Sequence, residues 1–482
     1  MKNLLVVLCS YLYLIVNRVI IKLRIYEVFS MKIIIVGQGK VGRSIAIALA
    51  KEKHDIIVVE QNAKVLSKMR DTLDVMTLQG NGTSADTLVE AGVESADLCI
   101  AVTSSDEANL LCCLIAKKLG ATNTIARVRN PQYAKDLYLY RNELGLSMHI
   151  NPELEAAREI SKILRFPSAI HMESFCAGKV DIVEGKVEER SPLVGCALKD
   201  LRKRFRSNIL VCAVDRNGEV TIPAGDFVLQ ANDRIHIIGK LADVEHFIEN
   251  VGTLPRPVQK VMIVGGGKIS YYLGMDLSKT KMQVKIIEMN EERCKELALA
   301  LPKVMVLEGD GTDSDILDEE GFKEMDAFVA LTGIDEENII LALNAIQANV
   351  KKVITKVHHI RENSTLYTLG IDTYISPKDV TANKIVSYVR AMQNSFGSNV
   401  EAMSKIVSGK VEALEFVVKR NMPFINIPLM DLKFKKNLLI GCIVRNGEII
   451  YPKGNDVILT DDHIIVVTTQ EGLQDVSDIF AK

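Results

Sequence analysis

The sequence lacks several signatures that would assign a function class at once. Its 59 Lys and Arg residues nearly balance its 61 Asp and Glu residues, so the net charge is only −2 and no whole-chain attraction toward nucleic acid is expected. Nine cysteines are scattered along 482 residues, and no two have the spacing of a zinc site or a redox dithiol. This pattern suits a reducing cytosol and predicts no metal site.

Long hydrophobic runs are also scarce. The apolar stretch from Leu4 to Val16 is shorter than the roughly 20 residues that a helix needs to span a bilayer. Basic residues follow it without a convincing signal-peptide cleavage site, and no other window has transmembrane length. Met31 then begins MKIIIVGQGKVG, which reads as the start of a first strand. We expect residues 1–30 to be an upstream extension or a misassigned start, with a membrane anchor as the alternative.

What the sequence does contain is an internal duplication of whole modules, with copies about 229 residues apart. The similarity extends far along each copy, since NILVCAVDRNGEVTIPAG from Asn208 aligns with NLLIGCIVRNGEIIYPKG from Asn437. Matched positions, first copy then second, are Gly37 and Gly265, Gly39 and Gly267, Glu60 and Glu288, Gly80 and Gly309, Thr103 and Thr332, Asp106 and Asp335, Glu107 and Glu336, and Asn109 and Asn338. Each copy therefore holds two modules.

Each copy begins with β-branched runs that alternate with helical stretches, which predicts strand–helix–strand units on a parallel sheet. Later, Asn217-Gly218 and Asn446-Gly447 separate apolar runs and predict tight hairpins. The predicted fold class is α/β, with two tandem Rossmann-like doubly wound parallel-sheet domains, each followed by a small α+β C-terminal domain. The expected boundaries are 31–150 and 259–376 for the Rossmann-like domains, and 172–253 and 402–482 for the smaller ones.

A glycine-rich turn follows the first predicted strand. Gly37, Gly39 and Gly42 have the spacing of a dinucleotide fingerprint, in which backbone approaches a pyrophosphate at a helix N-terminus. At the end of the second strand, Glu60 is placed to accept hydrogen bonds from a ribose diol and to repel a 2′-phosphate, which favours NAD. The predicted site comprises Gly37, Gln38, Gly39, Lys40, Val41, Gly42 and Glu60. A turn that only packs strand on helix is the alternative.

The second copy carries an altered version of this turn. Ser270 stands where the third glycine belongs, and its side chain is expected to hold the helix farther from the strand. The predicted second site comprises Gly265, Gly267, Lys268, Ile269 and Glu288. Weaker binding, a different nucleotide preference and a purely structural role all remain open.

Further loops are expected at the carboxyl edge of each sheet, where ligands bind in such folds. Asn81, beside Gly80, and Asp310 in the second copy are candidates to contact a ribose or adenine, although a plain turn explains them equally well. Thr103 follows the fourth strand, and Asp106 and Asp335 are expected to be helix caps. Arg127 and Lys356, in the next strand, are candidates to face a phosphate, with a solvated surface charge as the alternative.

Catalytic residues are missing from the pattern. None of the eight histidines recurs at the same position in both copies, and the sequence shows no nucleophile elbow. We therefore expect no enzyme and no catalytic residues, so that the nucleotide is a ligand. An NAD-dependent oxidoreductase is the alternative, because dehydrogenases share the fingerprint and a fold does not dictate function.

From Met31 to Lys482 the chain resembles the TrkA family, the tandem RCK (KTN) domain regulators of Trk-type potassium uptake. The resemblance covers both glycine turns, both acidic residues, both TxxDExN loops and both C-terminal modules. It implies a cytoplasmic regulatory subunit, peripheral to the inner face of the membrane, that assembles as a homo-oligomeric gating ring on a potassium-translocating membrane subunit. It also implies sensing of NAD+ or NADH, or of ATP and ADP, with Gly37, Gly39, Gly42 and Glu60 holding NAD in the first copy.

Overall fold

The computed structural model describes residues 30–481, except 71–72, 166–170, 252–257, 359–362, 396–399, 408, 420–421, 471 and 474. The predicted extension at residues 1–30 therefore lies, apart from Ser30, outside the described residues. The chain forms two compact units that divide after Asn151. In the described part of the chain, no helix is both long and apolar enough to cross a membrane.

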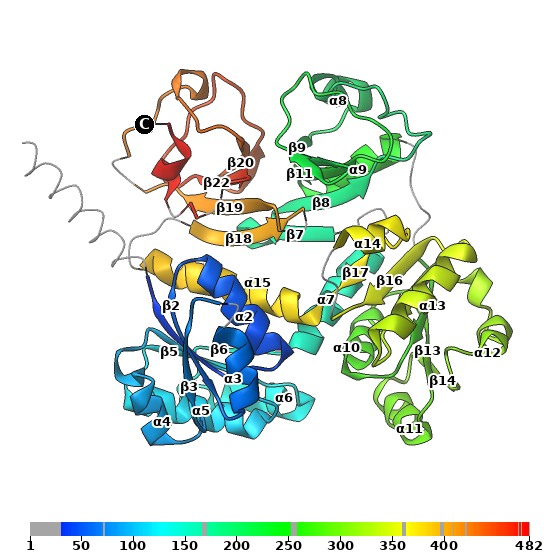
Figure 1. Cartoon of the computed structure of the whole chain (residues 1–482). Coiled ribbons are helices and arrows are strands. Elements are labelled where there is room, and N and C mark those ends of the chain that lie inside the picture. The colour runs from blue at the N-terminus through cyan, green and yellow to red at the C-terminus, as the bar shows by residue number, and fades with distance from the viewer. Residues whose placement is uncertain are drawn as a thin grey trace, which may run out of the picture. The chain divides into compact units, whose positions relative to one another are not determined.

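The first unit is N-module 1, a six-stranded sheet in the order β3-β2-β1-β4-β5-β6. All of its strand pairs are parallel. The strands are β1 (Lys32–Val36), β2 (Asp55–Glu60), β3 (Met76–Gln79), β4 (Leu98–Ala101), β5 (Asn123–Arg127) and β6 (Met148–Ile150). The helices between them are α2 (Lys40–Lys51), α3 (Ala63–Arg70), α4 (Ala85–Glu90), α5 (Asp106–Leu119) and α6 (Pro131–Tyr140), with a short turn η1 (Val93–Ser95) (Figure 1).

N-module 2, in the second unit, repeats this topology as β14-β13-β12-β15-β16-β17. Its strands are β12 (Lys260–Val264), β13 (Gln283–Glu288), β14 (Met305–Glu308), β15 (Ala327–Ala330), β16 (Lys352–Lys356) and β17 (Tyr374–Ile375). Its helices are α10 (Lys268–Leu277), α11 (Glu291–Ala300), α12 (Ser314–Glu319), α13 (Asp335–Gln347) and α14 (Asn363–Thr368), with η3 (Phe322–Glu324). The central strands are apolar on both faces, as expected where helices cover a parallel sheet.

Each parallel sheet is followed by a small antiparallel one. C-module 1 contains β7 (His171–Phe175), η2 (Cys176–Gly178), β8 (Val180–Lys186), α8 (Leu198–Phe205), β9 (Leu210–Arg216), β10 (Glu219–Thr221), β11 (Arg234–Gly239) and α9 (Leu241–Val251). C-module 2 contains β18 (Val400–Ile406), β19 (Val411–Val417), η4 (Leu429–Asp431), β20 (Leu438–Arg445), β21 (Glu448–Ile450), β22 (His463–Thr468) and η5 (Val476–Ile479). The predicted hairpins are present, because β9 pairs with β10 and β20 with β21 across left-handed Asn-Gly turns.

The predicted fold class is thus confirmed. The two C-modules also share an apolar core, in which Phe175, Val180 and Ile182 pack with Ile406 and Val411. Arg216 and Arg445 occupy equivalent places in the two sheets, and each forms a two-point ion pair inside its own module, with Asp233 and Asp462.

Two helices connect the modules, α7 (Pro152–Arg165) and α15 (Pro377–Ser395). Each begins at a proline, whose fixed φ and missing N–H suit the first position of a helix. Helix α7 follows the first sheet in sequence but packs in N-module 2. Ala156, Ala157, Ile160, Ile163 and Leu164 are buried in one core with the β12 strand and the apolar face of α10. Polar contacts join the same two helices, because Asp276 accepts hydrogen bonds from Ser161 and Arg165.

Candidate nucleotide sites

The glycine turn of N-module 1 connects β1 to α2. Gly37 has a φ of +98°, which L side chains rarely adopt, and a Cβ there would lie 2.8 Å from the Thr103 nitrogen. A Cβ on Gly42 would lie 2.0 Å from the Gly37 carbonyl oxygen, so helix and turn are in direct contact. Gly39 differs from both, because a Cβ there would meet nothing within 4 Å. The turn thus leaves open space at the helix N-terminus, where a dinucleotide fingerprint admits a pyrophosphate.

The turn of N-module 2 keeps the same backbone path. Gly265 has a φ of +97°, and Gly267 has φ −66° and ψ −171°, compared with −65° and −175° at Gly39. Ser270 is fully buried, and its hydroxyl donates a hydrogen bond to the Gly265 carbonyl. Because the first copy has no room for a Cβ at this contact, the second must hold helix and turn in a slightly different way. The serine therefore changes the packing behind the turn and leaves its ligand-facing torsions intact.

The remaining predicted residues of the two turns differ in exposure. Lys40 and Lys268 are exposed first residues of their helices, Val41 is half-buried and Ile269 is buried. The backbone amides of such first residues have no partner within their own helix. They are the groups that an anion would meet.

Glu60 and Glu288 are joined to the turns by hydrogen bonds. Glu60 accepts one from the Gln38 amide at 2.8 Å and one from the Asn62 amide at 2.9 Å. Glu288 accepts the corresponding bonds from Gly266 at 2.6 Å and Asn290 at 2.9 Å. Each carboxylate oxygen has a second lone pair to offer, so both acids are held at the turn and can still accept from a ribose.

Gln38 and Arg293 lie beside the two turns, and of these only Gln38 was part of the predicted sites. Gln38 is 6% exposed, and neither atom of its side-chain amide has a hydrogen-bond partner among the described residues. A buried amide without partners is rare in folded proteins and fits a group that completes its bonds on a ligand. In the second copy Gly266 replaces it, and Arg293 donates from Nε to the Gly266 carbonyl at 2.8 Å. The second turn therefore has a guanidinium beside it, where the first copy has Val65.

Thr103 and Arg127 meet at the carboxyl edge of the first sheet through Asn109. The Asn109 side chain accepts from the Thr103 amide at 2.8 Å and from its hydroxyl at 2.7 Å, and donates to the Arg127 carbonyl at 3.0 Å. The Arg127 guanidinium also donates to the Thr103 carbonyl. Asn338 makes the equivalent bonds to Thr332 and Lys356. The recurring asparagine thus ties the ends of two neighbouring strands together beside the glycine turn.

The expectation that Asp106 and Asp335 are helix caps is wrong. Ser105 caps α5 by accepting from the Ala108 amide, and Asp106 is the first helical residue. Its carboxylate instead accepts from the Arg129 and Asn130 amides, at 2.8 and 2.7 Å. Asp335 likewise accepts from the His358 amide at 2.8 Å. Each aspartate side chain reaches the loop that follows the next strand, because that loop presents backbone donors toward it.

The other candidates fall into two groups. Asn81 and Asp310 are exposed. The Asn81 side chain accepts hydrogen bonds from the backbone amide and the hydroxyl of Thr83, and Asp310 accepts the same two bonds from Thr312. This is the geometry of a plain turn, which the sequence offered as the alternative. These bonds lower the pKa of Asp310. Lys356 is 8% exposed, so it is not a solvated surface charge, and its ammonium lies 3.4 Å from the Leu331 carbonyl.

Gly80 lies beside Asn81 and is held by packing, since a Cβ on it would come within 2.4 Å of the Thr87 side chain. These loops therefore shape the edge of the sheet beside the turn.

A parallel sheet with a glycine turn, followed by a small antiparallel sheet and then repeated in full, defines a class of protein with two tandem Rossmann-like domains. Residues 33–152 and 261–377 match the TrkA-N domain, and residues 182–252 and 413–481 match the TrkA-C domain. The chain belongs to the TrkA family.

Relatives and solved structures agree with this assignment. The Trk system potassium uptake protein TrkA homolog of Archaeoglobus fulgidus is 35% identical over 450 residues, covering 93% of this chain and 100% of that protein. The Trk system potassium uptake protein TrkA of Halomonas elongata is 33% identical over 454 residues, covering 93% and 98%. Among solved structures, the GsuK channel bound to NAD has a TM-score of 0.60 at 19% identity, covering 92% of this chain and 77% of that one. The fold is therefore shared with most of the GsuK channel chain.

Proposed function

We propose that this chain is a nucleotide-sensing regulatory subunit of a Trk-type potassium uptake system. The observation that carries the proposal is the retention, in both copies, of a glycine turn with the same torsions and an open position at Gly39 and Gly267. Membership of the family of Trk potassium uptake proteins supplies the transport context. In this role the chain acts in the cytoplasm at the inner face of the membrane, as a homo-oligomeric ring on the potassium-translocating subunit.

The first site is proposed to hold NAD+ or NADH. Its phosphates would lie at the N-terminus of α2, Glu60 would accept from a ribose, and Gln38 would complete its hydrogen bonds on the ligand. The solved GsuK channel that shares this fold was determined with NAD, which supports the same ligand class here. The Arg293 guanidinium beside the second turn suits a ligand with more phosphate charge, such as ADP or ATP.

Regulation requires that the nucleotide bind one conformation of the chain better than another. A tenfold difference in affinity between two conformations supplies about 1.4 kcal/mol per site. The contributions of several sites in a ring add, and their sum shifts the equilibrium between the two conformations. No covalent step is needed, so the proposal assigns no catalytic residue and describes the chain as a sensor.

Titration calorimetry of the full-length chain with NAD+, NADH, ATP and ADP tests the nucleotide part. The full chain is needed because α7 completes the core of N-module 2. We expect saturable binding of NAD+ or NADH, and absence of binding by all four would refute the proposal. Sustained NADH oxidation with common carbonyl substrates would favour the oxidoreductase instead.

Affinity purification of the chain from membranes tests the transport part. We expect a potassium-translocating membrane subunit to co-purify, in an amount that depends on added nucleotide. If the chain binds nucleotide but no such subunit co-purifies, the transport role is overturned. The chain would then be a nucleotide-binding assembly protein without a role in transport.

A further inference from the structure

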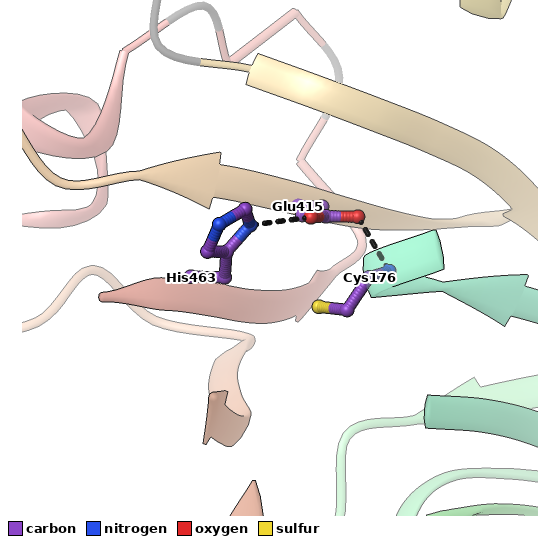
Figure 2. Close-up of side chains that lie close together, drawn as sticks. All are labelled: Cys176, Glu415 and His463. Atoms are coloured by element: carbon purple, nitrogen blue, oxygen red, sulfur yellow. Dashed lines mark hydrogen bonds and ion pairs between the residues drawn. The ribbon is translucent and has the colours of Figure 1, made fainter. Parts of the chain in front are cut away.

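Three metal-binding side chains meet where the two C-modules share their core. Cys176 begins the η2 turn after β7 of C-module 1, whereas Glu415 lies in β19 and His463 begins β22 of C-module 2. One ligand atom from each residue lies within 4.8 Å of the other two. Figure 2 shows the thiol of Cys176 extending from its turn toward the side of Glu415 on which His463 lies. The cluster therefore takes donors from both modules.

The fold holds these side chains in place. Glu415 is 4% exposed, and it accepts a hydrogen bond from the Cys176 backbone amide at 2.8 Å. Its other oxygen lies 2.7 Å from Nδ1 of His463. Cys176 has a φ of +52°, a left-handed conformation that costs free energy for a residue with a side chain. The hydrogen bond to the buried Glu415 carboxylate holds Cys176 in this strained conformation, so the side chains of the cluster are already positioned before any ligand binds.

The donor set matches one class of cation. Thiolate sulfur, imidazole nitrogen and carboxylate oxygen are the ligands of Zn²⁺, and softer thiolate and imidazole donors select against Mg²⁺ and Ca²⁺. Bonds of about 2.3 Å to sulfur and about 2.0 Å to nitrogen and oxygen place tetrahedral ligand atoms roughly 3.3–3.6 Å apart. The three side chains need only small rotations to reach such spacings, with the cation replacing the contact between His463 and Glu415.

The surroundings have the charge and the space that a cation needs. The cluster lines a cavity of about 340 Å³, to which Glu401, Asp461 and Lys179 also contribute. Three carboxylates thus face one ammonium. The His463 side chain is 36% exposed, so the cavity has access to solvent.

The internal repeat supplies a built-in comparison. The corresponding turn of C-module 2 has Val407 in place of Cys176, with a φ of +53°. At the positions of Glu415 and His463, C-module 1 has Glu184 and Arg234, which form an ion pair at 3.0 Å. Valine has no donor atom and arginine stays protonated. Only one of the two related positions can therefore bind a metal, which fixes the expected stoichiometry at one ion per chain.

We propose that Cys176, Glu415 and His463 bind a single Zn²⁺-class transition-metal ion that joins C-module 1 to C-module 2. Water occupies the remaining coordination position, as in zinc sites with three protein ligands. Cysteine spacing along the chain predicted no zinc site, because zinc motifs place their ligands close together in sequence. Here Cys176 lies 239 residues from Glu415, and Glu415 lies 48 residues from His463. The inference does not rest on nucleotide binding and goes beyond it.

The test uses the full-length chain after removal of metal with a chelator. Competition titration with Zn²⁺ and a chromophoric chelator is expected to give one ion per chain, accompanied by a rise in melting temperature. Co²⁺ loaded in place of Zn²⁺ is expected to show a thiolate charge-transfer band. If the three residues form only a hydrogen-bonded contact, the chain takes up no ion and the proposal is overturned.

Variants assign the ligands. Cys176→Ser and His463→Gln should each weaken Zn²⁺ binding at least about tenfold, and Cys176→Ser should abolish the Co²⁺–thiolate band. Cys294→Ser is the matched control, because this buried cysteine lies in N-module 2, and it should keep both signals. If Cys176→Ser does not fold, His463→Gln, whose side chain is partly exposed, still decides the question. Unchanged affinity in His463→Gln would refute the assignment.

Discussion

Gly39 offers the sharpest test of the first nucleotide site, because its replacement by asparagine should separate binding from stability. The Gly39 backbone, with φ −65° and ψ −175°, is open to any residue, and a Cβ there meets nothing within 4 Å. Asparagine is also among the best residues at the start of a helix, where Gly39 stands. We therefore expect the free energy of unfolding to change by no more than about 0.5 kcal/mol.

The effect on binding should be much larger. The new side chain would occupy the space beside the first amides of α2, where the pyrophosphate is proposed to lie. Hydrogen bonds to a charged partner contribute about 1.5–3 kcal/mol each, so loss of two removes about 3–6 kcal/mol. Since each 1.4 kcal/mol is tenfold, the affinity for NAD should fall at least about 100-fold.

Titration calorimetry with NAD measures the affinity, and urea denaturation measures the stability of the same preparation. Gly267→Asn is the matched variant in the second copy, where the torsions and the open space are the same. It should leave the first site unchanged. Unaltered NAD affinity and stoichiometry in stably folded Gly39→Asn would show that the turn does not bind the nucleotide.

Three further predictions concern the acid beside the turn, the strand ends and the connecting helix. Glu60→Gln should weaken NAD binding and narrow its advantage over NADP in competition assays, because the charge that repels a 2′-phosphate is gone; an unchanged NAD-to-NADP ratio would argue against a ribose contact. Asn109→Ala removes the side chain that bonds the Thr103 amide and the Arg127 carbonyl, so it should lower the free energy of unfolding by about 2–4 kcal/mol in urea denaturation. A loss below about 0.5 kcal/mol would contradict this hydrogen-bond network. Ile160→Ala removes a fully buried side chain between α7 and N-module 2 and should cost about 2–5 kcal/mol by the same measurement, whereas a negligible cost would place α7 elsewhere.

Features encoded by local pattern could be predicted from the sequence. The parallel sheets follow from β-branched runs alternating with helical stretches, and the hairpins follow from Asn-Gly pairs, because each signal lies within a few residues of the structure it specifies. The torsions at Gly37 and Gly265 are predictable for the same reason, since only glycine adopts them easily.

Features that depend on side-chain direction or on distant packing could not be predicted. Asp106 has the residue type and location of a cap, but Ser105 takes that role while Asp106 reaches the next loop. The burial of Gln38 without partners depends on how the turn packs. The meeting of Cys176 with His463 requires knowing that the C-modules share a core. No short-range pattern carries that information.

The packing of α7 has a consequence for a single copy of the duplicated modules. By sequence the helix ends the first N-module, yet its apolar face is covered by β12 and α10 of the second. A protein made of one copy would expose that face to water unless a second chain covered it. A duplicated chain of this kind thus covers internally an apolar face that a single copy could cover only by pairing with a second chain.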